Sequence, residues 1–289
     1  MITAKMVSEL REKSGAGMMD CKKALVETNG DMEKAMEFLR EKGISKAQKK
    51  SSRIAAEGIS KIFIKDNKAI IIEVNCETDF VSSNEKFQSF VSLIGEAILN
   101  SDATTVEDAL KVETKEGSVE DVIISNTATI GEKLSLRRFE VLEKSDDEVF
   151  GEYIHMGGKI AAITVVKGKN EEVAKDVAMQ AAAMKPEYLD ESEVPEDRIE
   201  KEKEILKVQA IEEGKPAEIA EKMVAGRIKK FFKDICLVDQ AFIKDSGMDV
   251  KTYLKNNDSE ITKMVRYEVG EGMEKRKDDF AEEVMSQIK

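Results

Sequence analysis

The sequence predicts an α+β protein in which helices and antiparallel hairpins occupy separate stretches of the chain. Two β-rich hairpins are each followed by an amphipathic helix, and a helical segment precedes the first hairpin. Half of the residues in 185–230 are charged, which is typical of helices that project into solvent. A chain of 289 residues also has room for about two domains.

Residues 1–53 predict a module of three short helices followed by a basic linker. Caps and glycines set the helix limits, and the third helix is predicted to end at Gly43. The second helix carries Met18 at core spacing, where a methionine is usually buried. Residues 44–53 are polar and basic, and offer either a cationic face for an acidic partner or a solvated hinge. We favour the hinge.

Residues 54–145 and 146–260 predict two related subdomains of the core, each built from antiparallel strands with a flanking helix. The hairpins cover 59–75 and 149–166, with turns at 66–67 and 156–158, and the helices begin after Asn84 and Asn170. The segment 76–83, between the first hairpin and its helix, is predicted to be a loop.

An antiparallel helical hairpin is predicted at about 187–234, inserted in the second subdomain. Its helices meet at the break 214–216, and their apolar seam is thin: Ile199, Leu206, Ile219 and Met223. Residues 261–289 are predicted to finish the core with the end of a strand, and to add a C-terminal helical module at 277–288.

The composition excludes several classes of function. A net charge of −12 and the lack of tryptophan argue against direct binding of nucleic acid. The chain has no apolar run long enough for a membrane span and begins without a signal peptide, so we expect a cytoplasmic protein. One histidine and three scattered cysteines exclude a zinc site and a disulfide framework.

Enzyme chemistry is also not expected. His155 would have to serve any histidine-dependent mechanism, and no acid or nucleophile accompanies it in the sequence. The glycine-rich loops that hold nucleotide phosphates do not occur. We therefore expect no catalytic residue, no metal and no cofactor.

Four motifs carry a resemblance to a known family: V-S-E-L-R-E-K-S-G-A-G-M-M-D-C-K-K-A-L at 7–25, T-D-F-V at 78–81, Y-I-H-M-G-G-K at 153–159 and R-Y-E-V-G-E-G at 266–272. In this order they resemble bacterial elongation factor Ts over essentially the whole chain. Ser14 stands where the family often has threonine, and Lys159 where it often has arginine.

The resemblance implies a translation elongation factor that exchanges guanine nucleotides without bond chemistry. Its partner would be elongation factor Tu, bound in the GDP-bound and nucleotide-free states so that GDP leaves and GTP can bind. The implied architecture has an N-terminal module like ubiquitin-associated domains, a two-subdomain core, a coiled-coil hairpin and a C-terminal module. Some relatives form homodimers, and the sequence does not decide this point.

The resemblance also assigns the site residues. Thr78, Asp79, Phe80 and Val81 would reach the magnesium region of elongation factor Tu, where the phenyl ring acts as a wedge. Spacing alone would instead place Phe80 under the following helix. Further contacts with the partner are expected at Arg11, Met18, Met19, His155, Gly157 and Gly158, although the two glycines also suit a tight turn.

A second function stays open at this stage. The chain could be a non-catalytic adaptor whose three-helix module binds a ubiquitin-like or ribosomal partner. An adaptor would leave the rate of GDP release from elongation factor Tu unchanged, whereas an exchange factor would raise it.

Overall fold

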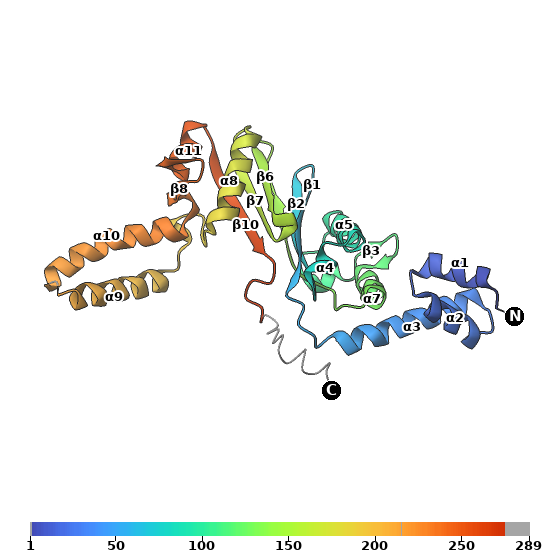
Figure 1. The fold of residues 1–289 in the computed structure, drawn as a ribbon. Helices are drawn as coiled ribbons and strands as arrows, with labels where there is room; N and C mark the ends of the chain where they lie inside the picture. Colours follow the sequence, from blue (N-terminus) through green and yellow to red (C-terminus); the bar gives the residue numbers. More distant parts are fainter. Residues whose placement is uncertain (1, 215, 275–289) are drawn as a thin grey trace. The chain divides into compact units, whose positions relative to one another are not determined.

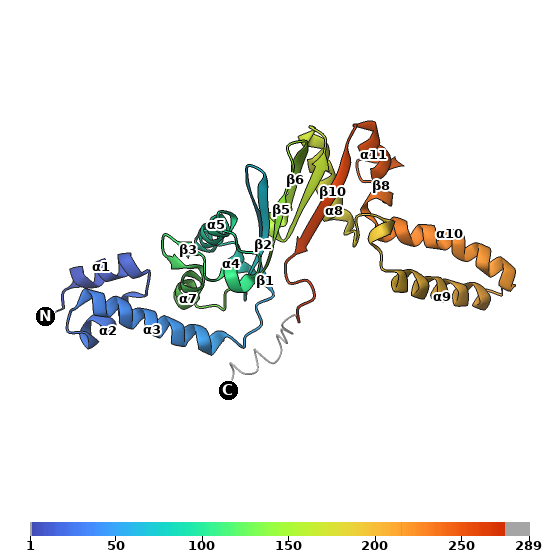
Figure 2. The same ribbon diagram turned by 180° about the vertical axis from the view of Figure 1, so that it is seen from behind.

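The structure is a computed structural model that describes residues 2–214 and 216–274. These residues form two compact units, and Figures 1 and 2 show the course of the chain through both. The first unit contains 2–141, 157–159 and 267–274, and the second contains 142–156 and 160–266. Helices alternate with small antiparallel sheets, which agrees with the predicted α+β class.

The N-terminal helices are α1 (Ala4–Ser14), α2 (Met18–Glu27) and α3 (Met32–Lys50). Thr3 caps α1, since its hydroxyl accepts a hydrogen bond from the Met6 amide at 3.3 Å. Asp31 caps α3 in the same way through the Lys34 amide. Leu10, Cys21 and Leu25 are fully buried between the helices, so this small core forms as predicted.

The predicted end of the third helix at Gly43 is wrong, because α3 continues to Lys50. The hinge predicted at 44–53 is therefore helical over most of its length. Gly43 is buried within α3, where this helix packs on α7 (Val119–Ile130) beside Ala128. This packing offsets the cost of a glycine within a helix, about 0.5–1 kcal/mol.

The first sheet has the order β1-β2-β5, with β1 (Glu57–Lys65), β2 (Lys68–Cys76) and β5 (Ser135–Glu143). β1 and β2 pair from Lys65 opposite Lys68, and Asp66 takes a left-handed conformation in the turn, as predicted. Asn84 caps α5 (Glu85–Leu99), whose Phe87 and Ile94 are buried against this sheet. The short elements α6 (Val106–Ala109), β3 (Glu113–Thr114) and β4 (Gly117–Ser118) complete this region.

The second sheet has the order β10-β7-β6, with β6 (Glu148–His155), β7 (Ile160–Lys167) and β10 (Glu260–Glu268). Asn170 caps α8 (Glu171–Met184), which lies across β6 and β7 (Figure 1). A Cβ atom on Gly151 would lie 2.1 Å from the Ala174 carbonyl, so glycine is needed where strand and helix meet. Beyond them lie β8 (Ala241–Phe242), β9 (Asp245–Asp249) and α11 (Val250–Asn256).

The helical hairpin consists of α9 (Glu196–Glu212) and α10 (Ala217–Ile235), which pack side by side (Figures 1 and 2). Its root is an apolar cluster around Phe232, Ile235 and Cys236. Ile219 was predicted in the seam but is 49% exposed, whereas its neighbour Ala220 is fully buried. The smaller side chain lies at the contact because it allows the two helices to approach closely.

We expect the outer part of the hairpin to be dispensable for folding. Replacing residues 203–226 by a short glycine-rich bridge should preserve a cooperative thermal transition, since most of the apolar burial of the hairpin lies at its root. Calorimetry would check this. The longer deletion 196–233 removes Phe232 from the root cluster and should lower the melting temperature clearly. Loss of cooperative unfolding in the shorter deletion would contradict the prediction.

No helix in the described ranges is long and apolar enough to cross a membrane. The predicted C-terminal helix at 277–288 lies outside the described residues. The division of the chain into the four predicted parts stays a prediction.

Candidate functional site

The segment that carries the T-D-F-V motif is a single helical turn, α4 (Asp79–Ser82), and not the predicted loop. Thr78 caps this turn, because its hydroxyl accepts a hydrogen bond from the Val81 amide at 3.3 Å. The Ser82 hydroxyl donates to the Asp79 carbonyl at 2.9 Å. These hydrogen bonds fix both the start and the end of the turn, which follows β2.

Phe80 is 85% exposed, more than any other large apolar side chain in the described parts of the chain. The alternative in which Phe80 packs beneath the following helix is therefore wrong. Val81, the next residue, packs against the core of the first unit instead. Because successive residues of a helical turn point about 100° apart, burial of Val81 directs the phenyl ring into solvent.

Two carboxylates hold the start of the turn. Glu132, which follows α7, accepts hydrogen bonds from the amides of Glu77 and Thr78 at 2.9 and 3.0 Å, and from the Thr78 hydroxyl at 2.6 Å. Glu77 in return accepts the Lys133 amide at 2.6 Å and pairs with Arg53 at 3.2 Å. Charge-assisted bonds of this kind are among the stronger ones in proteins.

The Asp79 side chain does not contribute to this ordering. It is exposed, and within the described residues it makes no hydrogen bond or ion pair. Of the two polar residues Thr78 and Asp79, only Thr78 fixes the turn through its side chain. The Asp79 carboxylate beside Phe80 is left available to a partner.

Cys76 lies beside the turn without the properties of a nucleophile. Its thiol is fully buried and donates to the Thr78 carbonyl at 3.1 Å. Burial, together with the nearby charge of Glu132, raises the pKa of the Cys76 thiol to about 12. The thiol therefore stays protonated at neutral pH and serves as a small apolar side chain.

The Y-I-H-M-G-G-K motif forms the turn between β6 and β7. His155 is exposed, with Nδ1 at 3.5 Å from the Tyr153 hydroxyl. Met156 and Gly157 both have positive φ, and Met156 is 72% exposed. A Cβ atom on Gly158 would lie 2.9 Å from the Ser60 carbonyl, so the backbone passes β1 where only glycine fits.

The N-terminal candidates lie on the surface of their module. Arg11 is exposed on α1, and Met18 and Met19 at the start of α2 are 56% and 74% exposed. Placing Met18 in the core, as its spacing suggests, is therefore wrong. Cys21, Ala24 and Leu25 already fill the inner face of α2. The structure brings Thr78–Val81 together on one turn, whereas Arg11 lies on α1 and both Met18 and Met19 lie on α2.

Comparison with known proteins places the chain among translation factors. The family model described as Elongation factor TS matches residues 77–271, well over half of the chain. A relative named elongation factor Ts, from Lactiplantibacillus plantarum, is 52% identical over 288 residues, covering 100% of this chain and 99% of the relative. The chain belongs to the elongation factor Ts family. It is thus a translation elongation factor, as its four motifs indicated.

The family match includes the α4 turn and the β6–β7 turn, whereas residues 1–76 are covered through the full-length relative. Sequence reasoning missed Glu132, which supports the α4 turn, and the exposed Met156 of the β6–β7 turn. Glu132 gave no local signal, because it lies 54 residues from its hydrogen-bond partner Thr78. Met156 lies within the Y-I-H-M-G-G-K motif, but its residue type gave no sign of its 72% exposure.

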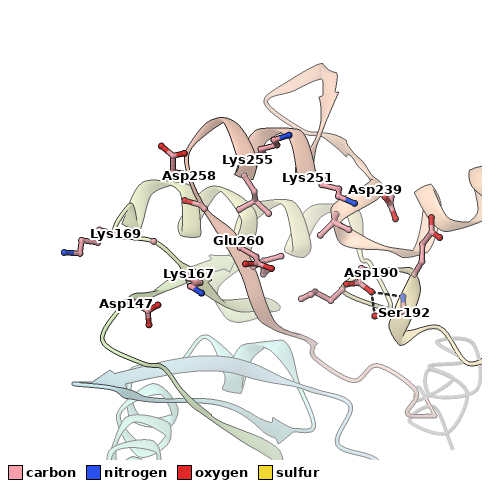
Figure 3. A pocket seen from close by; sticks show the side chains of 17 residues that line it. Asp147, Lys167, Lys169, Asp190, Ser192, Asp239, Lys251, Lys255, Asp258 and Glu260 are labelled. Carbon is pink, nitrogen blue, oxygen red and sulfur yellow. Dashed lines mark hydrogen bonds between the residues drawn. The ribbon is translucent and has the colours of Figure 1, made fainter.

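A cavity of about 1140 Å³ lies in the second unit, between α11, β10 and the short helix η2 (Glu191–Glu193). Figure 3 shows charged side chains of both signs around it, among them Lys167, Lys255 and Glu260, with Asp190 bonded to Ser192. This mixture favours neither an anion nor a cation. The described residues hold no group of three or more metal-ligating side chains that could bind a metal ion.

Proposed function

We propose that the chain is a guanine-nucleotide exchange factor for elongation factor Tu. It binds the GDP-bound partner, disturbs the magnesium and phosphate contacts of the nucleotide, and promotes GDP release so that GTP can bind. The observation that carries the proposal is the 85% exposure of Phe80, on a turn fixed by hydrogen bonds within the family motif.

An exchange factor must bind the nucleotide-free partner more tightly than the GDP-bound one. An exposed aromatic ring suits this task, because full burial of a phenylalanine is worth about 1.5–3 kcal/mol and this gain is still unused in the free protein. If the ring finds its pocket only when the magnesium region has opened, its burial stabilises the state from which GDP leaves. No covalent bond is made or broken in this cycle.

The remaining residues serve as docking contacts in this proposal. The N-terminal module, similar to ubiquitin-associated domains, offers Arg11, Met18 and Met19 as exposed side chains. The β6–β7 turn offers the exposed His155 and Gly157, while the buried Gly158 would act by shaping this turn. The α9–α10 hairpin corresponds to the coiled coil of the family, and the protein acts in the cytoplasm, where translation takes place.

The test measures release of labelled GDP from elongation factor Tu in the presence of excess unlabelled nucleotide. We expect the protein to raise the release rate in proportion to its concentration until the partner is saturated. Elongation factor Tu alone gives the basal rate. A complex that forms while the rate stays basal would favour the adaptor over the exchange factor.

A further inference from the structure

Glu132 is placed to control Phe80 without touching it. We propose that Glu132 is a positioning residue for nucleotide exchange: its carboxylate holds the α4 turn in the orientation that presents Phe80 to the partner. This inference rests on the proposed function, because it explains how the exchange motif is presented. It adds a residue that lies outside the T-D-F-V motif and far from it in sequence.

The α4 turn needs support from outside. A helix of four residues cannot persist on its own, since nucleation costs more than its few hydrogen bonds return. Phe80 has little contact with the protein that could hold it, given its 85% exposure. Its direction must therefore come from the backbone between β2 and α5, and most directly from the residues that start the turn.

The Glu132 carboxylate fixes that start at three points. One oxygen accepts the amides of Glu77 and Thr78 at 2.9 and 3.0 Å, and the other accepts the Thr78 hydroxyl at 2.6 Å. The same hydroxyl caps α4 through the Val81 amide. Glu132 thus sets both the backbone entering the turn and the rotamer of its capping residue.

The support is reciprocal. Glu77 accepts the Lys133 amide at 2.6 Å, so each segment donates backbone amides to a carboxylate of the other. We call this exchange of bonds between Glu77–Thr78 and Glu132–Lys133 the clasp. Arg53, which follows α3, joins the clasp as well: its side chain pairs with Glu77, and its carbonyl accepts the Lys133 ammonium at 3.0 Å. Several charge-assisted bonds between the same two segments fix one well-defined geometry.

Geometry and charge can be separated at this position. In Glu132→Gln the amide oxygen can still accept the two backbone amides, and the amide nitrogen can donate to the Thr78 hydroxyl, which accepts as well as donates. Glu132→Gln should therefore keep most of the exchange activity. Glu132→Ala removes all three bonds and should lower the saturating rate of GDP release roughly tenfold.

The experiment compares Glu132→Ala, Glu132→Gln, Phe80→Ala and the double variant in GDP release, with Glu96→Ala as control. Glu96 is exposed on α5, so its removal deletes one negative charge far from the clasp in sequence. If Glu132 acts through Phe80, Glu132→Ala should cause no further loss in the Phe80→Ala background. Multiplied defects in the double variant would overturn the proposal.

Amide hydrogen exchange of the free protein supplies a readout that does not depend on nucleotide exchange. In Glu132→Ala the amides of residues 78–83 should exchange at least several-fold faster, while those of β2 and α5 stay protected. Unchanged protection of 78–83 would refute the positioning role even if the protein is an exchange factor. If these amides exchange faster in Glu132→Ala but the wild-type protein never accelerates GDP release, the structural role of the clasp is supported. Only the proposed function is then refuted.

Discussion

Phe80→Ala should leave the fold intact and lower the saturating rate of GDP release by a factor of tens to hundreds. An aromatic side chain at the centre of an interface is worth roughly 2–4 kcal/mol, and each 1.4 kcal/mol is about tenfold in rate. The free protein makes little use of the ring, which is 85% exposed. Its removal should therefore change the free energy of unfolding by less than about 1 kcal/mol, whereas a buried ring would cost about 3–5 kcal/mol.

Two measurements on one variant decide this prediction: the melting temperature of the free protein, and GDP release from elongation factor Tu at saturating factor. Ile243→Ala is the matched control, because this apolar side chain is also exposed, at 45%, and belongs to none of the predicted contacts. The rate should fall more than the affinity for nucleotide-free partner. A stable Phe80→Ala variant with a normal release rate would remove the wedge from the mechanism.

The sequence correctly predicted those turns and helix starts that depend on residues close together in the chain. Asp66 marks the first hairpin turn, and Asn84 and Asn170 cap the helices that follow the two hairpins, as their types and spacing indicate. Gly43 misled the prediction, because α3 packs on α7 at this position and continues through the glycine to Lys50. A glycine looks the same in sequence whether it ends a helix or lies within a helix that tertiary packing stabilises.

The candidate site was likewise predictable from the sequence only in part. The T-D-F-V motif could be found in the sequence, but the helical turn and its support could not, since Thr78 and Glu132 are separated by 54 residues. The exposure of Phe80 could not be derived from spacing either, because Val81 beside it is equally able to fill the core position. Only the packing of the first unit shows which of the two side chains points inward.

Glu73 is a fully buried charged residue whose burial the sequence did not predict. It lies fully buried in β2, where its carboxylate receives Arg137 at 2.9 Å, Arg138 at 2.7 Å and the Gly270 amide at 2.9 Å. The Arg138 guanidinium also stacks on Tyr267, 4.0 Å from the ring centre. One carboxylate thus connects β2, β5 and the segment after β10 within the first unit.

These contacts determine how Glu73 responds to pH. Burial alone would raise the pKa of its carboxyl group, but the Gly270 amide and the two guanidinium groups together bring the pKa below its ordinary value of 4.5. A carboxyl group with a lowered folded-state pKa stabilises the fold above the pKa of the unfolded chain. This contribution is lost as the pH falls from about 4.5 through the folded-state pKa.

We therefore expect Glu73→Ala to lower the free energy of unfolding of the first unit at pH 7 by about 3–5 kcal/mol, since it removes the carboxylate that two arginines and a buried amide share. Glu73→Gln keeps one acceptor oxygen and should lose less free energy of unfolding at pH 7. As the pH falls from about 4.5 through the folded-state pKa, the stability of Glu73→Gln should fall less than that of the wild type. Urea midpoints at pH 7 and at pH 4 would measure both effects.

Glu152→Ala, which removes an exposed glutamate from β6, is the control and should change the midpoint little. A Glu73→Ala midpoint equal to that of the wild type would show that the arginines and the Gly270 amide find water or other acceptors, and that this carboxylate does not hold the first unit together.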